Sequence, residues 1–524
     1  MDEKETKKIK DKSMKSVEKI ESEIHEKCDE IIVFCKEKKE DVNFYSFEKA
    51  LKNKMCKLGC LFIQLFLMSI QNRLTYCGWL ATGKFYEKKV LLSRTINTIY
   101  GKVRYWRKYL YGKEKGEGLF PLDIEVGLTK DGFSPLVISL VTKLATRVSF
   151  ETSVLLFRCF NGWSPSSESI QALVLGMGRE TNSYMEMTMP FEGDGEVLVI
   201  QTDGKATPTA TEEELSKRRG KRKAKKQGCN CKRHRGKAKR KCCKSKRRKK
   251  GDKSKNGRSI TLVVMYTLKR GKDDKLHGPL NKKVWGSYVP RKVMLEWARN
   301  QATMRGFPLD TNKRIHIVID GERCLKKRLS VLFPTATFAL DICHLEEYIW
   351  EAGRAFYKEG SKELEKWVES KRKLLYKGHA AKLLFKVKEL RKKLSRRAKK
   401  DKSKRDALSK LIKYMEPRLD MMEYKSLIEE DLDIASGVVE GAARYVIGER
   451  MDCSGMRWIP ERAEALLHLR CIELNGEWDR FFDWSYNHWR KKLKEMEKVI
   501  VRTEIADDLS SEYFVEEQEV SVAA

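Results

Sequence analysis

Apolar and polar residues form short alternating blocks between residues 195 and 345. Apolar runs of roughly four to eight residues that end at polar residues predict buried strands. Strands are expected at 197–203, 259–267, 283–289, 314–320 and 335–341. Helices are expected at 292–305 and 322–332, where the apolar spacing is helical. Three strands in hairpin order, followed by a helix and a parallel strand, predict an α/β fold.

The segments on either side of this block have mainly helical patterns. Residues 1–94 are charged at first and then apolar, which predicts a helical N-terminal region or an oligomerisation arm. Helices are also expected over 346–435, which is rich in Lys, Arg and Glu, and over 436–500, which is rich in aromatic residues. Residues 501–524 form an acidic tail, which is expected to be disordered from Ile505 onward.

Residues 95–190 combine a hairpin pattern with two short helices. Basic and aromatic residues alternate at 95–107 and predict a hairpin that turns near Gly101. One helix is expected at 149–160, and a second begins after Ser166, which is in a capping position. Two short helices about a tight turn fit a helix-turn-helix, whose second helix would enter the major groove of DNA. A helical pair inside a bundle gives the same pattern, so both interpretations remain open.

The net charge of the chain is +35, and this excess implies a polyanionic partner, either nucleic acid or an acidic membrane surface. Much of it comes from an insertion at 214–258, between the first two expected strands. Residues 217–250 contain 21 Lys or Arg in 34 positions and no acid. Such a run cannot form a core, and it attracts DNA through counterion release without reading its sequence.

Cysteines are concentrated in the same insertion. Cys229, Cys231, Cys242 and Cys243 could complete a tetrahedral Zn²⁺ site. Their spacing departs from the usual Cys-x2-Cys pairs, so a solvated basic arm without zinc remains the alternative. The 14 cysteines of the whole chain show no secreted framework, which suits a reducing cytosol.

Targeting and membrane signals are weak. Residues 1–19 are a run of mixed charge, which does not fit a signal peptide. The most apolar window, 58–70, is about a dozen residues long and too short to span a bilayer. We therefore expect it to form a buried helix, in a cytoplasmic, nucleoid-associated protein without a membrane partner.

Two of the expected strands end in an aspartate followed by glycine, at Asp203 and Asp320. The carboxyl end of a buried strand lies at a sheet edge, where ligands bind in open α/β sheets. A third acid, Glu440, opens a later expected helix. Two aspartates and a helical glutamate form the metal-binding set of RNase H-like nucleotidyl transferases. Two Mg²⁺ ions, or Mn²⁺ in their place, would clamp the attacking and leaving oxygens of phosphoryl transfer.

Other acids fit this role less well. Glu449 lies nine residues after Glu440, and at ~100° per residue it falls on the opposite face of a regular helix, whereas Arg444 shares the Glu440 side. Asp194, Glu322 and the acids at 430–433 lie outside strand ends or helix faces that could meet the metal. Asp341 and His344 follow the last strand, and His344 is either structural or touches DNA or a catalytic carboxylate.

Taken in order, these motifs resemble the DDE transposases of bacterial insertion sequences of the Kra type, which are distantly similar to Mutator-like transposases. The resemblance covers about residues 90–490. Its motifs are GKVR at 101–104, FPLD at 120–123, QTDGK at 201–205, VIDGE at 318–322, LDICHLEEY at 340–348, SGVVEGA at 436–442 and GMRW at 455–458.

The resemblance implies an RNase H-like core with Asp203, Asp320 and Glu440 as catalytic, metal-binding acids. It also implies an accessory pair, Asp341 and His344, and an all-helical insertion that would correspond to 346–435. Two departures stand out. Relatives often carry a Cys-x2-Cys ribbon after the hairpin, whereas 111–115 has no cysteine, and the basic insertion is longer than expected.

The function implied is that of a transposase, an enzyme that cleaves the terminal inverted repeats of its element and joins their ends to target DNA. A homo-oligomer is expected because two ends must be brought together. The residues expected to contact DNA are Arg104, Arg107, Lys205, Arg444, Arg457 and Trp458. The alternatives are a non-catalytic nucleic-acid-binding protein derived from a transposase and an RNase H-like nuclease without strand transfer. Retention of all three acids favours an enzyme.

Overall fold

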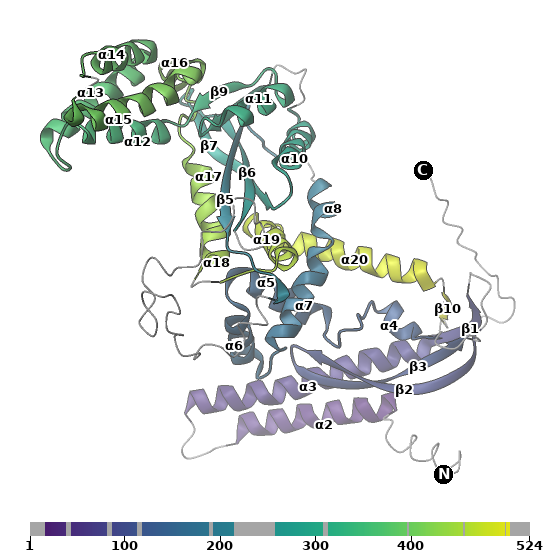
Figure 1. Ribbon diagram of the computed structural model, residues 1–524. Coiled ribbons are helices and arrows are strands. Elements are labelled where there is room, and N and C mark those ends of the chain that lie inside the picture. The colour runs from purple at the N-terminus through teal and green to yellow at the C-terminus, as the bar shows by residue number, and fades with distance from the viewer. Residues whose placement is uncertain are drawn as a thin grey trace, which may run out of the picture. The chain divides into compact units, whose positions relative to one another are not determined.

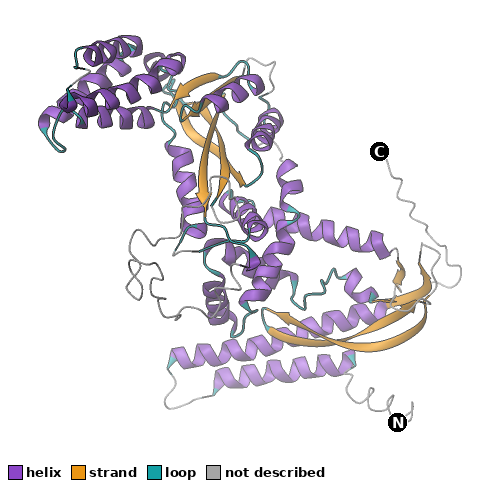
Figure 2. Cartoon of the chain, viewed as in Figure 1, coloured by secondary structure: helices purple, strands orange, loops and turns teal. Residues whose placement is uncertain are grey.

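The computed structural model shows a mixed α/β protein (Figures 1 and 2). Its chain divides into two compact units. The first unit comprises Met1–Ser139, Cys159–Trp163 and Tyr486–Ala524, and the second comprises Leu140–Arg158 and Ser164–Ser485. The structure describes residues 16–37, 43–80, 86–112, 118–187, 192–213, 257–307, 313–395, 398–453, 456–497 and 499–503. The expected zinc ligands in the basic insertion and the expected disordered tail lie outside these residues.

Two long helices begin the first unit, α2 (Val17–Lys36) and α3 (Phe44–Arg73). Each has a side-chain cap, because Ser16 accepts a hydrogen bond from the Lys19 amide and Asn43 accepts one from the Ser46 amide. The core of this unit contains Ile20 and Ile24 of α2, three residues of α3, and residues of the hairpin that follows. The described residues of the N-terminal region are therefore mainly helical as far as Arg73.

Helix α3 is longer than the apolar window recognised in the sequence. It runs for 30 residues, and by length and composition alone it could cross a membrane. The expectation concerned the apolar window 58–70 alone, whereas the helix that contains this window extends well beyond it on the N-terminal side. The expectation of a buried helix is confirmed only in part, because Leu58, Leu67 and Met68 of α3 are buried in the core of the first unit whereas Phe62 and Phe66 are exposed.

Strands replace helix after Arg73, so the expectation of helix up to residue 94 is wrong for this part. Strand β1 (Leu74–Leu80) pairs with β10 (Val499–Thr503), and β2 (Tyr86–Thr98) pairs with β3 (Gly101–Gly112). The expected turn at Gly101 is confirmed, and its φ of +137° suits a glycine. Strand β4 (Gly118–Leu119) extends this sheet beside β3.

A buried aspartate joins the hairpin to the short helix α4 (Pro121–Glu125). Asp123 accepts hydrogen bonds from Arg94 (2.7 Å) and from the Tyr105 hydroxyl (2.8 Å), and it forms an ion pair with Arg107. Burial lowers the pKa of Arg107 to about 10. The guanidinium of Arg107, expected to contact DNA, is thus engaged in the interior of the first unit.

Replacing Asp123 with alanine is expected to destabilise the first unit by about 3 kcal/mol, because it leaves two partly buried arginines without their carboxylate. The measurement is the urea unfolding midpoint of the full chain. Asp131 is exposed, so Asp131→Ala serves as a control and should change the free energy of unfolding by less than about 0.5 kcal/mol. Equal effects of the two substitutions would contradict a structural role for the cluster.

A five-stranded mixed sheet forms the centre of the second unit. Its strands are β5 (Val197–Thr207), β6 (Arg258–Arg270), β7 (Leu276–Ser287), β8 (Arg314–Ile319) and β9 (Thr337–Leu340). They lie in the order β7-β6-β5-β8-β9, with the first three antiparallel and with β8 and β9 parallel to β5. Helices α10 (Arg291–Met304) and α11 (Arg323–Leu332) connect them. All five expected strands and both helices are present, but β5 does not end at Asp203 as expected: it continues for four residues to Thr207, and Asp203 pairs with Leu262 of β6.

Between β9 and the helix that bears Glu440 lies a helical segment, also as expected (Figure 1). It contains α12 (Ile342–Arg354), α13 (Lys362–Tyr376), α14 (Ala380–Lys392), α15 (Lys399–Met415), η2 (Glu416–Met421) and α16 (Tyr424–Glu429). The Tyr424 hydroxyl donates to the Leu340 carbonyl (2.9 Å), which ties this segment to the end of β9.

A continuous helical run then carries Glu440. It consists of α17 (Gly437–Ala442), the π-helical turn η3 (Ala443–Gly448) and α18 (Glu449–Met451). Helices α19 (Pro460–Leu474) and α20 (Trp478–Glu497) follow. A π turn changes the angle between successive residues, so Glu440 and Glu449 are not related by the regular helical phase assumed from the sequence.

Between α4 and the five-stranded sheet, the described residues form α5 (Pro135–Arg147), α6 (Phe150–Asn161), α7 (Ser167–Gly178) and α8 (Thr181–Glu186). The two helices about the 162–165 break are confirmed, and Ser166 caps α7 by accepting from the Ser169 amide. Helix α7 packs against α19, buries Ile170, Leu173 and Val174, and has no Lys or Arg. These features favour the bundle interpretation over a DNA-recognition helix.

Candidate metal centre

Three aspartates stand at one level across adjacent parallel strands. Asp203 and Asp320 each lie two residues beyond paired positions, Gln201 of β5 and Val318 of β8. Val318 also pairs with Ala339 of β9, and Asp341 lies two residues beyond it. Because neighbouring strands are about 4.8 Å apart, this register sets the three backbones in one row. The Asp341 amide extends the pairing by donating to the Ile319 carbonyl (2.8 Å).

The same face of the sheet supports the segment that leads to Glu440. Gln201 accepts a hydrogen bond from the Val439 amide (3.0 Å), and His316 lies 2.6 Å from the Asp433 carbonyl. Side chains at even spacing along a strand share a face. Asp203 lies two residues after Gln201 and Asp320 four after His316, so both acids belong to the face that meets this segment.

A glycine allows the chain to turn directly after Asp320. Gly321 has a φ of +86°, and a Cβ atom there would lie 2.6 Å from atoms of Arg418 and Leu340. The Tyr414 hydroxyl donates to the Asp320 carbonyl (2.8 Å), and Arg418 donates to the Gly321 carbonyl. The Asp320–Gly321 pair therefore forms a tight turn, which Tyr414 and Arg418 of the helical segment hold in position.

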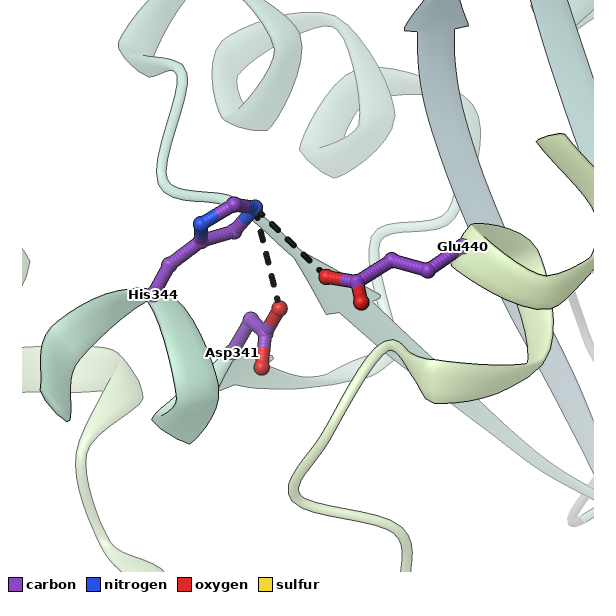
Figure 3. A group of neighbouring side chains, drawn as sticks. All are labelled: Asp341, His344 and Glu440. Carbon is purple, nitrogen blue, oxygen red and sulfur yellow. Dashed lines mark ion pairs between the residues drawn. The ribbon is translucent and has the colours of Figure 1, made fainter. Parts of the chain in front are cut away.

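Asp341, His344 and Glu440 form an acidic–histidine cluster, in which the side chains point toward one another from two helices (Figure 3). One potential ligand atom from each lies within 4.8 Å of the others. His344 Nε2 is 3.9 Å from Asp341 Oδ2 and 3.8 Å from Glu440 Oε1. Asp341 is buried, His344 is partly buried and Glu440 is exposed.

Asp341 also has structural partners. Its Oδ1 accepts from the Cys343 amide (2.9 Å) and so caps α12, and its Oδ2 accepts from the Ser436 hydroxyl. Ser436 Oγ is 3.4 Å from Glu440 Oε1. Ser436 therefore links the end of β9 to the start of α17 and keeps the two carboxylates close together.

The electrostatics of the cluster favour a cation. Burial lowers the pKa of His344, but the carboxylates of Asp341, Glu347 and Glu440 outweigh it, so the pKa is raised. Burial and the same negative surroundings raise the pKa of the neighbouring Cys343 thiol. A divalent ion suits this donor set, because carboxylate oxygen binds Mg²⁺ and Mn²⁺ and imidazole nitrogen binds transition metals.

Asp203 and Asp320 belong to the row but not to the cluster. Asp203 Oδ1 accepts from the Gly204 amide (2.6 Å), and Asp320 Oδ1 accepts from the Glu322 amide (3.0 Å). Among the described residues, the cluster joins Glu440 to the two residues that the sequence assigned an accessory role. The sequence signal for Asp341 was its position after a third parallel strand, which makes it equivalent to the other two aspartates.

A cavity of 760 Å³ opens beside Asp320 and His344, against the helical segment. Tyr348 and Tyr414 stack in its wall with ring centroids 4.1 Å apart. The remaining lining residues are Glu347, Glu351, Lys410, Lys413 and Arg418. Of the expected metal-binding acids, Asp320 lines this cavity, which is large enough for part of a substrate and also has two lysines and an arginine in its wall.

The lower-ranked acids each have another partner. Asp194 binds Arg305 through two hydrogen bonds (2.6 and 3.0 Å), and Glu449 lies 3.7 Å from Arg470. Glu322 forms an ion pair with Arg291. These pairings direct all three carboxylates away from the cluster. The exclusion of Glu449 thus rests on its contact with α19 rather than on helical phase.

The residues expected to contact DNA differ in accessibility. Arg444 and Arg457 are exposed, and Lys205 lies on the Asp203 face of β5. Arg104 contacts Ser93 (3.3 Å) in the hairpin. Trp458 is only 7% exposed, and its indole N–H donates to the Met451 carbonyl (2.8 Å), so its ring packs in the interior.

No protein-family model matches this chain, and no curated protein matches its sequence. Its function is therefore inferred from the strand-end aspartates, the acidic–histidine cluster and the charge around them.

Proposed function

We propose that this chain is a DDE-type transposase, which cleaves DNA at the ends of a mobile element and joins the resulting 3′-hydroxyls to target DNA. The observation that carries the proposal is the common register of Asp203 and Asp320, each two residues beyond the last residue pair of the parallel strands β5 and β8, with α17, which bears Glu440, packed against β5. Carboxylates at one level of a sheet with a helical glutamate suit metal-dependent phosphoryl transfer.

The topology supports an RNase H-like core. Three antiparallel strands are followed by two strands parallel to the first, in the order β7-β6-β5-β8-β9. The helical segment between β9 and α17 supports the insertion expected before the catalytic glutamate. Fold alone does not define an activity, so the acids carry more weight than the topology.

In this proposal Asp203, Asp320 and Glu440 hold two Mg²⁺ ions, which Mn²⁺ can replace, with Asp341 and His344 alongside. Bound ions of this kind activate water and offset the charge on the scissile phosphate. Gln201 and Ser436 orient the start of α17 and so set the position of Glu440. Lys413, exposed in the wall of the 760 Å³ cavity, offers a positive charge to a phosphate near the acids.

The partner in this proposal is double-stranded DNA, both the terminal repeats and the target. The net charge of +35 favours such a polyanion. A homo-oligomer that brings two DNA ends together, located at the nucleoid in the cytoplasm, belongs to the same proposal.

Replacing Asp203 with asparagine tests it. The substrate is DNA carrying the inverted repeats that flank the gene, incubated with the full chain and Mg²⁺. The cleavage rate should fall by more than about 100-fold, while DNA affinity stays the same. The figure of about 100-fold is the largest loss of activity typical for residues that only support the metal ligands. Asp483 is exposed, so Asp483→Asn is the matched control and should cleave normally.

Undiminished cleavage by Asp203→Asn would refute the assignment of the site. Product analysis separates the alternatives, because a nuclease without strand transfer would release cut ends and never join them to a second DNA molecule. A non-catalytic DNA-binding protein would bind the repeats but leave them intact.

A further inference from the structure

A second cavity lies in the second unit, among the first residues of three helices and away from the strand-end acids. Its volume is 360 Å³, and it is lined in part by the starts of α6, α7 and α19. Ser149 directly precedes α6, Ser167 is the first residue of α7, and Arg462 lies in the first turn of α19. Two further arginines, Arg450 and Arg457, also line it.

Arg450 is the residue that distinguishes this cavity. It is 2% exposed, and its guanidinium lies 5.1 Å from the ring centroids of both Phe150 and Trp458. Nε donates to the Ala145 carbonyl (2.9 Å). Nη2 is buried and has no hydrogen-bond partner among the described residues. A buried cationic donor without an acceptor is costly, and an anion bound in the cavity would supply the acceptor.

The helix starts add to this preference. The first amides of a helix have no partner within the helix, and together with the helix dipole they favour anions. Side chains already cap part of these ends, since Ser149 accepts from the Thr152 amide and Ser166 from the Ser169 amide. Helix α19 has no side-chain cap. Its first residue, Pro460, has no N–H, so the donors that its first turn offers are the amides of Glu461 and Arg462.

The charge balance of the lining is positive. Three arginines face one acid, Glu151. Arg457 is exposed, and Arg462 is 3.7 Å from Glu212 in a solvent-exposed pair that contributes little. The cavity lining therefore combines a buried arginine, Arg450, with an exposed one, Arg457, and a partly exposed one, Arg462.

We propose that this cavity binds a backbone phosphate of DNA, with Arg450 as the buried ligand and Arg457 and Arg462 as the accessible ones. This inference rests on the proposed function, because the choice of DNA over a free phosphate ion follows from the DNA-processing role and the net charge of +35. Arginine and helix amides are common donors to DNA phosphates, and such contacts position the protein without reading sequence.

The test measures the affinity of the full chain for two duplexes of unrelated sequence across a range of salt concentrations. The double variant Arg457→Gln/Arg462→Gln should lower the slope of log K against log salt by about 1, and by the same amount for both duplexes. The matched control is Arg299→Gln/Arg328→Gln, which removes two exposed arginines elsewhere in the second unit and should leave the slope unchanged. Equal slopes for the two double variants would overturn the proposal.

A second arm uses inorganic phosphate and the buried ligand. At constant ionic strength, phosphate should raise the thermal midpoint of the wild-type chain and raise it less for Arg450→Lys, provided that the variant shows a cooperative transition. The double variant provides the same comparison if Arg450→Lys does not fold. Phosphate protection with an unchanged DNA slope would overturn the proposal in favour of a small-anion site.

The two proposals can fail separately. A wild-type chain that does not bind DNA would count against the proposed function. A wild-type chain that binds DNA with the same salt slope as the double variant would count against this cavity alone.

Discussion

Replacing Glu440 with glutamine is expected to reduce Mg²⁺-dependent DNA cleavage by more than about 100-fold. Loss of a residue that only hydrogen-bonds to a metal ligand typically lowers activity about 10- to 100-fold, and loss of a ligand itself should lower it further. Glu440 Oε1 lies 3.8 Å from His344 Nε2, in the acidic–histidine cluster with Asp341. The residue before it, Val439, is held by the hydrogen bond from its amide to the Gln201 side chain. Cleavage rates of the purified full chain, measured under single-turnover conditions, check this.

The matched control is Glu449→Gln, on the same helical run. Glu449 is exposed and lies 3.7 Å from Arg470 rather than beside the cluster. It should keep close to wild-type cleavage, and the thermal midpoints of both variants should be similar. If the two substitutions reduced cleavage equally, the loss of any negative charge from α17 or α18 would be enough to explain the effect. That result would contradict a specific role for Glu440.

The second large effect is expected at Asp341. Asparagine keeps an oxygen that can accept from the Cys343 amide and cap α12, but it removes the negative charge beside His344. We therefore expect Asp341→Asn to fold, to bind Mn²⁺ about 10- to 100-fold more weakly, and to cleave more slowly. Alanine removes the cap as well and should cost about 1 kcal/mol more in stability.

The pKa of His344 gives an independent measure of the same substitution. The Asp341 carboxylate is the largest of the influences that raise this pKa. In Asp341→Asn the pKa of His344 should fall, and NMR titration of the metal-free chain would detect the change. An unchanged pKa together with unchanged Mn²⁺ affinity would show that Asp341 acts only as a helix cap.

The sheet of the second unit could be predicted from the sequence because each of its strands has a distinct local pattern. Buried runs such as 197–203 and 314–320 are apolar almost throughout and end at Asp-Gly. The Gly101 turn was predicted for a similar reason, since basic and aromatic residues alternate beside it. Asp203 and Asp320 were found from the same patterns, although β5 continues past Asp203 to Thr207 and the register of the two aspartates needed the structure.

What the sequence could not supply depends on contacts between distant segments. Strand β1 pairs with β10, more than 400 residues away, and no local pattern reveals such pairing. Arg107 has a partner in Asp123 only once α4 packs on the hairpin. The link between Asp341 and Glu440 likewise depends on Ser436, and the π turn altered a phase argument that assumed a regular helix.

The most direct measurement is the position of bound metal. Crystals of the full chain grown with Mn²⁺ should show anomalous scattering within bonding distance of the Asp203 and Asp320 carboxylates, with Glu440 as a further ligand. Anomalous density confined to Asp341 and His344, with none beside Asp203 or Asp320, would contradict the account.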